Sequence, residues 1–495
     1  MSSERKLVLV VVDSLHPDNL DRAISSGAAP TFAALVERGT LVRDCVSSFP
    51  SVTPVCTSEI QTGVGPDQHW IPGMNWYHRT EERYVEYGSS FEATRAFGVF
   101  RSLYDTVYNL NMGHLSPEVE TIFERLGDAG LRTACTPFLL YRGRTRHELG
   151  LDGLLRGVAV AAGFTHAVWG PDELFYGELY ASRIVPCRPT LARPGTRDEY
   201  SACVGRELEK AGLYDFLLFS LPDHDYYSHK LGPDNALDSI SAADNALGEL
   251  IEAGGGLDNF LDEHALLLVS DHAQTAVTEP LPLAEILAAD WRVLAPNSES
   301  DEGAEIAVGP TARAGGVYIL LEGRRYKRAH ERIRERLLGS AGVDLVTWIE
   351  GEEAVVANGE SELRFAPGSH HVDRRGEGWA TEGDLGVLEL AGRDGRITSE
   401  AYPDALGRLW RALRGPNAAD VVVSLDEGWE CVDWGGATHV IGGSHGSLLA
   451  GDSLCPLLMV GWPDDVAERR EQWTLRDVHG LAAEHFEVGV PEAVA

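Results

Sequence analysis

Leu7-Val-Leu-Val-Val-Val12, followed at once by Asp13, is the stretch that decides the fold. A short, continuous and largely β-branched apolar run is typical of a strand buried on both faces of a parallel sheet. Similar runs recur at 214–220, 265–270 and 456–461, and segments with helical patterns lie between them at 30–38, 119–129 and 235–253. This alternation predicts an α/β fold with a helix-flanked, mostly parallel central sheet.

Two stretches interrupt the alternation. Residues 64–118 are rich in glycine, aromatic and charged residues, which favours a lid-like excursion near an active site. Residues 280–435 contain strand-like runs and a charged helical segment, so we interpret them as an inserted α+β subdomain. The catalytic core is then expected to comprise residues 1–279 and 436–495.

Composition excludes several classes of partner. The 495 residues include 42 Lys and Arg against 76 Asp and Glu, a formal net charge of −34. Nucleic-acid polymers and anionic membrane surfaces require basic patches, so neither is an expected partner. The apolar run at 7–12 is too short for a signal peptide, and no window approaches the roughly 20 apolar residues of a membrane span. A cytoplasmic protein is therefore expected, whereas the oligomeric state cannot be inferred.

The cysteines suggest neither a disulfide framework nor a zinc ribbon. They are odd in number, widely spaced and contain no C-x-x-C pair, a pattern that does not favour either kind of site. The seven lie at positions 45, 56, 135, 187, 203, 431 and 455.

Carboxylate and imidazole side chains follow the predicted strands. Ligands of open parallel sheets bind beyond the carboxyl ends of the strands, so these positions are candidates for a site. Asp and His together are ligands of a borderline metal such as zinc. The candidates are Asp13, Asp223, His224, Asp225, His229, Asp271, His272, and His445 in the glycine-rich loop 442–447.

A hydroxyl-rich stretch, 49–63, supplies a candidate nucleophile. It ends in a helix-like segment, and the backbone N–H groups at the start of a helix suit an anionic substrate. A metal beside a hydroxyl would lower its pKa and make it a nucleophile. Both Ser51 and Thr53 are candidates for this role.

As a set, these motifs resemble the alkaline phosphatase superfamily, and within it the type I phosphodiesterase/nucleotide pyrophosphatase group. The matching blocks extend from residue 7 to residue 461. They are Asp13, Phe49-Pro-x-x-Thr53, Asp225-x-x-x-His229 with Lys230-x-Gly-Pro233 behind it, Ser270-Asp-His272, and Gly443-x-His-Gly446.

The resemblance implies a site for two divalent metals, with Thr53 as the nucleophile and as a ligand of the second metal. Zinc is the expected ion, although manganese or iron would tolerate a similar ligand set. The family often has asparagine three residues after the threonine, as a donor to substrate oxygen. Cys56 occupies that position here and is therefore a candidate for substrate binding. One metal would be held by Asp225, His229 and His445, and the other by Asp13, Asp271 and His272.

Three further residues are candidates for substrate binding. Asn75 and Tyr77, in the aromatic excursion, would contact a substrate head group or else pack the excursion onto the core. Arg142 lies in a basic run, 141–146, which would bind a second phosphate or carboxylate or else form a solvated turn.

These features predict a metal-dependent hydrolase that cleaves a small-molecule phosphodiester or pyrophosphate through a phosphothreonine intermediate. Two divalent ions about 4 Å apart would clamp the attacking and leaving oxygens. Phosphomonoesterase activity at the same site is the main alternative. A non-catalytic metal- or phosphate-binding homologue is less favoured because all seven motif positions are filled. A sulfatase is disfavoured because neither Cys45 nor Cys56 lies in a C/S-x-P-x-R context.

Overall fold

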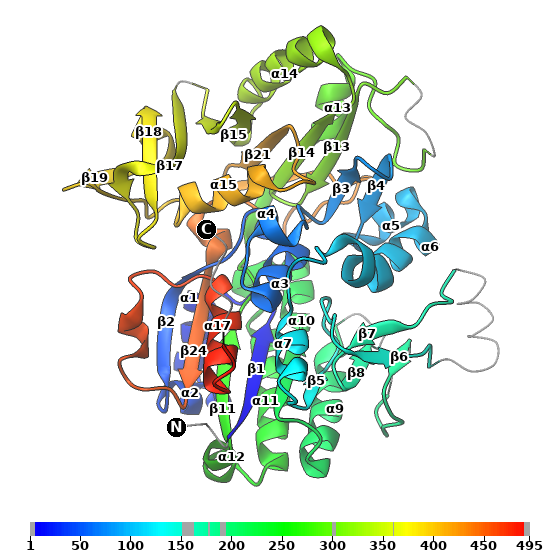
Figure 1. Ribbon diagram of the computed structural model, residues 1–495, viewed down its shortest axis with the longest axis vertical. Helices are drawn as coiled ribbons and strands as arrows, with labels where there is room; N and C mark the ends of the chain where they lie inside the picture. Colours follow the sequence, from blue (N-terminus) through cyan, green and yellow to red (C-terminus); the bar gives the residue numbers. More distant parts are fainter. Residues whose placement is uncertain are drawn as a thin grey trace.

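An eight-stranded sheet lies in the lower half of the molecule in the view of Figure 1. The computed structural model describes residues 5–150, 163–176, 179–188, 195–298, 303–359 and 361–489. The four strand pairs β1–β10, β1–β11, β10–β5 and β5–β8 are parallel, which confirms the predicted α/β fold. In spatial order the strands are β2 (Thr40–Val46), β24 (Leu454–Val460), β11 (His264–Val269), β1 (Lys6–Val12), β10 (Phe216–Leu221), β5 (Thr133–Cys135), β8 (Glu173–Tyr176) and β9 (Tyr180–Ala181).

The apolar run of β1 is continuous because helices cover both faces of the sheet. Leu7, Leu9 and Val11 pack on one face, and their neighbours in the strand pack on the other. Burial of each such side chain contributes roughly 1.5–3 kcal/mol. The first face is covered by α3 (Thr53–Thr62), α7 (Ile122–Asp128) and α17 (Arg476–His485), and the second by α1 (Pro17–Ser25), α2 (Pro30–Val36), α9 (Arg197–Ala211), α11 (Leu237–Ala253) and α12 (Leu257–Glu263).

The register of the central strands aligns their carboxyl ends. Val12 pairs with Leu221 in β10, and Val11 pairs with Val269 in β11. The chain therefore leaves three neighbouring strands at one edge, where the Asp- and His-containing segments begin. The apolar run at 456–461 behaves differently, because β24 is antiparallel to both β11 and β2.

A nine-stranded sheet occupies the other end of the molecule (Figure 1). Its neighbouring strands are antiparallel, apart from the parallel contact between β17 and β20. Helices α13 (Leu283–Ala288), α14 (Gly323–Leu338) and α15 (Ala405–Arg414) accompany it. The strands are β13 (Ile306–Thr311), β14 (Ala314–Ile319), β21 (Val421–Leu425), β15 (Val343–Glu350), β16 (Glu353–Ala357), β17 (Glu362–Val372), β18 (Gly378–Gly383), β19 (Ala391–Arg393) and β20 (Arg396–Thr398).

All these strands fall within the predicted insertion, 280–435, whose boundaries remain a prediction. A three-stranded sheet bridges both boundaries: β12 (Thr275–Leu281) pairs with β22 (Gly428–Cys431) and with β23 (Gly443–Ser444). The segments at the two boundaries are thus tied to the loop that carries His445.

The excursion 64–118 is firmly packed between the two large sheets. Its hairpin, β3 (Asn75–His78) and β4 (Arg83–Glu86), contacts β13 of the second sheet. Tyr84 donates a hydrogen bond to the Leu294 carbonyl and accepts one from the Val308 amide. The remaining elements are α4 (Pro66–His69), α5 (Phe91–Phe97), α6 (Val99–Tyr104) and the π-helix η1 (Asp105–His114).

One cysteine pair departs from the pattern expected of this sequence. Cys187 and Cys203 form a disulfide across a separation of 16 residues, whereas the five other cysteines are buried free thiols. The expectation of no disulfide framework fails for this pair, because the sequence does not reveal that the segment before α9 folds back onto that helix.

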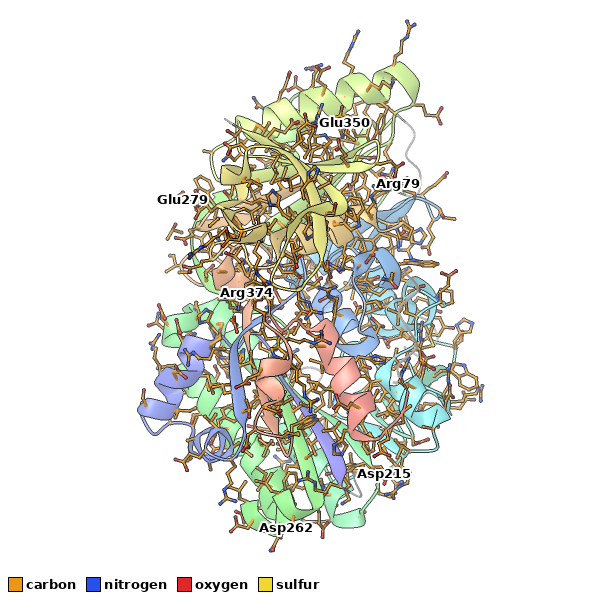
Figure 2. The ribbon with its side chains drawn as sticks, turned by 60° about the vertical axis from the view of Figure 1, so that its left-hand side comes forward. Arg79, Asp215, Asp262, Glu279, Glu350 and Arg374 are labelled. Atoms are coloured by element: carbon orange, nitrogen blue, oxygen red, sulfur yellow. A yellow bond between two sulfur atoms is a disulfide. The ribbon has the colours of Figure 1, made fainter. Side chains whose placement is uncertain are left out.

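Charged side chains project from both ends of the molecule. Figure 2 shows Glu350 and Arg79 at the end that holds the second sheet, and Asp215 and Asp262 at the opposite end. Among the helices that the structure describes, none is both long and apolar enough to cross a bilayer.

Candidate active site

The first group of predicted ligands lies where β1 and β11 end. Asp13 follows β1 directly, and Asp271 and His272 follow β11. Nε2 of His272 lies 3.8 Å from Oδ1 of Asp13 and 3.5 Å from Oδ2 of Asp271. One ligand atom from each of the three residues falls within 4.8 Å of the others, a spacing that a single metal ion can span.

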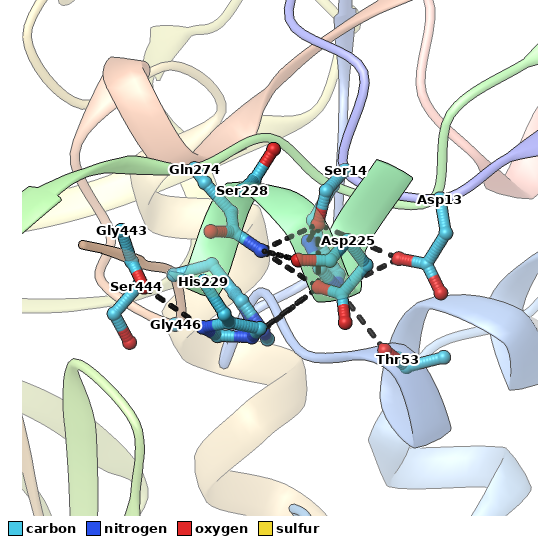
Figure 3. A network of polar contacts seen from close by, with 12 residues as sticks. Asp13, Ser14, Thr53, Asp225, Ser228, His229, Gln274, Gly443, Ser444 and Gly446 are labelled. Carbon is cyan, nitrogen blue, oxygen red and sulfur yellow. Dashed lines mark hydrogen bonds and ion pairs between the residues drawn. The ribbon is translucent and has the colours of Figure 1, made fainter. Parts of the chain in front are cut away.

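The second group adjoins the first. Asp225 and His229 lie one turn apart on α10 (Asp223–Leu231), and His445 comes from the loop after β23. Oδ1 of Asp225 lies 3.3 Å from Nε2 of His229 and 3.7 Å from Nε2 of His445. These three residues also place one ligand atom each within 4.8 Å of one another. Figure 3 shows Asp225 and His229 at the centre of the polar network, with Asp13 beside them.

The histidines present the ring nitrogen that a metal needs. Nδ1 of His229 lies 2.8 Å from the Gly443 carbonyl, and Nδ1 of His445 lies 2.8 Å from the Ser51 carbonyl. Because a carbonyl only accepts, each Nδ1 carries the proton, and the neutral ring keeps a lone pair on Nε2. Backbone carbonyls commonly fix metal-ligating histidines in this way.

The carboxylates also fit divalent cations. Burial, together with the charges of Asp271 and Asp225, raises the pKa of Asp13 well above its usual range. Burial and the charge of Asp225 likewise raise the pKa of Asp271 to about 7. Oδ2 of Asp271 is buried and has no hydrogen-bond partner. Buried carboxylates normally require a positive partner, and a metal ion would supply one here.

Thr53 is the first residue of α3, and its hydroxyl reaches this centre. Its Oγ1 lies 3.1 Å from Nε2 of His272. Ser51, the competing candidate, is engaged elsewhere: its hydroxyl donates to the Ser447 carbonyl and accepts from the Gly446 amide. Of these two hydroxyls, the Thr53 hydroxyl is thus the one that contacts a proposed metal ligand.

Asp223 and His224 also follow β10 but have other partners. Asp223 accepts a hydrogen bond from the Asp198 amide, and Nδ1 of His224 lies 2.8 Å from the Ser239 hydroxyl. Burial lowers the pKa of His224 to about 4, consistent with a neutral core histidine. The D-x-x-x-H spacing thus identifies Asp225 and His229, the pair that lies with His445 in the second group of ligands.

Arg142 makes structural contacts, and these contacts do not support its predicted role in substrate binding. Its guanidinium donates to Glu124 from Nε at 3.2 Å and from Nη2 at 3.1 Å. Nη1 donates to the Ser116 and Leu115 carbonyls, and Nη2 also donates to the Val119 carbonyl. With only 12% of the side chain exposed, these partners leave no donor directed at a ligand.

Asn75 and Tyr77 pack the excursion against the second sheet. Nδ2 of Asn75 donates to the Pro310 carbonyl, and the ring of Tyr77 lies 6.1 Å from those of both Tyr84 and Tyr318. Both residues are buried, so the structure supports the packing alternative for them.

Cys56 lies within α3 and is fully buried, and burial raises the pKa of its thiol well above the usual range. A thiol is a weak hydrogen-bond donor. The predicted contact between Cys56 and substrate therefore has no support in this arrangement.

Three residues that the sequence patterns did not identify contribute to the site. The Ser14 hydroxyl contacts Asp225 and His272, one ligand from each group, and Gln274 donates to Ser14 and to Asp225. Arg197, at the start of α9, contacts Asp223 at 3.3 Å, and its positive charge opposes the rise in the Asp13 pKa. No signal distinguishes them in the sequence, because none belongs to a spaced motif and Arg197 is remote from every predicted ligand.

Two other groups of potential ligands occur in the described residues, and in each a lysine or arginine side chain already pairs with the carboxylates. In the group His78, Glu81 and His114, Arg83 lies 2.6 Å from Glu81. Nδ1 of His78 accepts the Glu81 amide, so its Nε2 carries the proton. In the group Glu209, Glu263 and His264, Lys6 approaches both glutamates. These groups are better suited to structural ion pairing than to metal binding.

A family model described as type I phosphodiesterase / nucleotide pyrophosphatase matches residues 7–448. Among curated protein sequences, none matches significantly. Among solved structures, phosphonoacetate hydrolase from Sinorhizobium meliloti 1021 in complex with phosphonoformate has a TM-score of 0.55 at 17% identity, covering 98% of this chain and 96% of that one. Murine ectonucleotide pyrophosphatase/phosphodiesterase 5 has a TM-score of 0.58 at 13% identity, covering 99% and 98%. An inactive variant of that protein was solved in complex with AMP.

Proposed function

The chain belongs to the type I phosphodiesterase / nucleotide pyrophosphatase family of phosphoester hydrolases, and from this premise we propose that it cleaves a small phosphodiester or pyrophosphate with Thr53 as nucleophile. The observation that carries the proposal is the position of Thr53 Oγ1, 3.1 Å from Nε2 of His272, which belongs to one of the two groups of ligands. The phosphonate and nucleotide bound by the structural neighbours are small anions of related chemistry.

Two divalent ions, preferably zinc, fit the donor atoms of the site. Asp225, His229 and His445 would hold one, and Asp13, Asp271, His272 and Thr53 the other. When bound, the metals would supply the positive charge that activates the hydroxyl and stabilises charge on the leaving oxygen. Manganese and iron accept similar ligands, so the identity of the ions is part of the proposal.

The residues divide the reaction into two displacements. The Thr53 oxygen forms a bond to phosphorus as the bond to the leaving alcohol or phosphate breaks. Water then forms a bond to phosphorus as the bond to the Thr53 oxygen breaks, which releases a phosphomonoester from a diester substrate. The start of α3 fixes the threonine backbone, so its hydroxyl is already directed at the reaction centre.

Thr53→Ala provides the direct test. We expect hydrolysis of bis(4-nitrophenyl) phosphate to fall by at least roughly 10⁴-fold, as for removal of other catalytic nucleophiles. Ser58→Ala is a matched control, because this hydroxyl lies on the same helix but donates to the Pro54 carbonyl. Acid quenching of the wild type during turnover should trap the 4-nitrophenylphosphoryl group on Thr53. Undiminished turnover by Thr53→Ala would overturn the threonine mechanism.

Phosphomonoesterase activity is the alternative at this site. Comparing kcat/KM for bis(4-nitrophenyl) phosphate and 4-nitrophenyl phosphate separates the two functions, and faster monoester cleavage would reverse the proposed preference. Loss of both activities in Thr53→Ala would support a shared nucleophile. A metal-loaded wild type that turns over neither ester and only binds phosphate would support the non-catalytic alternative.

The compartment is a separate part of the proposal. The cytoplasmic location expected from the sequence remains a prediction, and the Cys187–Cys203 disulfide argues against it because disulfides persist mainly in oxidising compartments. Quantifying free thiols in protein isolated from its native cells under alkylating conditions would test this point. Seven thiols would favour the cytoplasm, whereas five would favour an oxidising compartment.

A further inference from the structure

Ser14 adopts a backbone conformation that disfavours its own side chain. It follows Asp13 at the end of β1, has a φ of +64° and is completely buried. In this left-handed region a Cβ atom is unfavourable, and glycine is the usual residue. Strained residues of this kind persist where the surrounding structure holds them, often at functional sites.

The contacts of the Ser14 hydroxyl explain why serine, and not glycine, occupies this left-handed position. Ser14 Oγ donates to Oδ1 of Asp225 at 2.8 Å and lies 3.2 Å from Nδ1 of His272. Asp225 belongs to one group of proposed ligands and His272 to the other. A single hydroxyl therefore contacts a ligand from each group, and Figure 3 shows Ser14 beside Asp225.

Gln274 completes this arrangement. Its Nε2 donates to Ser14 Oγ at 3.1 Å and to Asp225 Oδ1 at 2.7 Å. The amide must present its NH₂ group here, because the carboxylate of Asp225 can only accept. Its Oε1 is buried without a partner, so the glutamine holds this position despite an unsatisfied oxygen.

The hydrogen-bond directions set the form of His272. The Ser14 hydroxyl donates its one proton to Asp225, and its oxygen accepts a hydrogen bond from Gln274. The same oxygen can accept a second hydrogen bond, from Nδ1 of His272. The Ala273 carbonyl, 3.4 Å from the same Nδ1, can also only accept. Nδ1 therefore carries the proton, and the lone pair on Nε2 is directed toward Thr53, Asp13 and Asp271.

We propose that Ser14 and Gln274 are positioning residues that link the two metal sites, orienting Asp225 for one ion and fixing the tautomer of His272 for the other. The inference rests on the proposed two-metal function. Because Ser14 contacts ligands of both groups, loss of its hydroxyl should weaken the binding of both ions. Loss of a residue that contacts ligands of one group only should weaken the binding of one ion.

Metal binding to metal-free protein tests the link without relying on activity. Wild type, Ser14→Ala, Ser14→Gly and Gln274→Leu are titrated with Zn²⁺ against a competing chelator, and their thermal unfolding is recorded without metal. We expect both zinc affinities to fall roughly 10- to 100-fold in both Ser14 variants, the range usual for residues that orient metal ligands, and a smaller loss in Gln274→Leu. Ser239→Ala, which removes a buried hydroxyl beside His224, should leave both affinities unchanged.

The two Ser14 variants separate positioning from packing. Glycine relieves the left-handed backbone, so metal-free Ser14→Gly should be at least as stable as the wild type although it binds zinc as weakly as Ser14→Ala. Wild-type affinity at both sites in Ser14→Ala would overturn the inference. A loss of zinc affinity at only one of the two sites would also overturn the proposal that Ser14 links them. A wild type that binds no divalent ion would instead contradict the proposed function itself.

Discussion

The imidazole rings of His272 and His445 are stacked, with centroids 3.8 Å apart and planes inclined by 17°. The two residues belong to different groups of ligands, so the stack is a direct contact between the two groups. The charges of His272 and His229, added to burial, hold the pKa of His445 well below its usual value. Both rings of the stack are therefore suited to serve as neutral ligands.

Removing one ring of this stack should remove one metal. We expect His445→Ala to retain about one tightly bound divalent ion per chain where the wild type retains two, measured by elemental analysis after gel filtration. His224→Ala is the control, since that buried histidine bonds to Ser239 outside the site. Equal metal content in His445→Ala and the wild type would exclude His445 as a ligand.

Arg142→Ala should destabilise the protein without affecting substrate binding. Its guanidinium is buried between Glu124 and three carbonyls, and breaking a buried ion pair costs roughly 3–5 kcal/mol. The half-exposed Arg144 is a suitable control, because Arg144→Ala should cost less than about 1 kcal/mol. Thermal unfolding and KM are measured together. A raised KM with unchanged stability would restore the substrate-binding role predicted for Arg142.

We expect Arg197, and not the basic run 141–146, to attract an anionic substrate. It acts on Asp13 electrostatically and leaves 42% of its side chain exposed, so an incoming anion can reach it. Arg197→Ala should raise KM for phosphoesters roughly two- to fivefold, as for a partly exposed charge pair. Arg206→Ala, on the same helix but paired with Glu249, should leave KM unchanged. An equal effect of both variants would indicate only a change in net charge.

The sequence predicts structural features that depend on residues close together in the chain, and site residues that directly follow a predicted strand. The continuous run of β1 predicts a doubly covered strand, and Asp13, Asp271 and His272 follow from where such strands end. The contacts of Arg142 could not be predicted because its main partner, Glu124, lies 18 residues away, and spacing does not reveal that pair. The role of Ser14 depends on an unusual backbone angle and on Gln274, 260 residues further along. Tertiary contacts of this kind leave no local pattern.

Glu59 should make the stability of the metal-free protein depend on pH. It lies buried on α3, and burial, opposed by Arg476 and Arg411, raises its pKa from 4.5 to about 7. The folded protein thus binds this proton more tightly than the unfolded chain, so the contribution of Glu59 to stability is lost as pH rises from about 4.5 to about 7. The shift corresponds to roughly 3 kcal/mol. Between pH 5 and pH 8, the free energy of unfolding of Glu59→Gln should therefore rise by roughly 3 kcal/mol relative to that of the wild type, measured by urea unfolding with chelator present. Glu249→Gln, at an exposed position, should gain nothing, and parallel pH profiles for Glu59→Gln and the wild type would show that Glu59 does not titrate in this range.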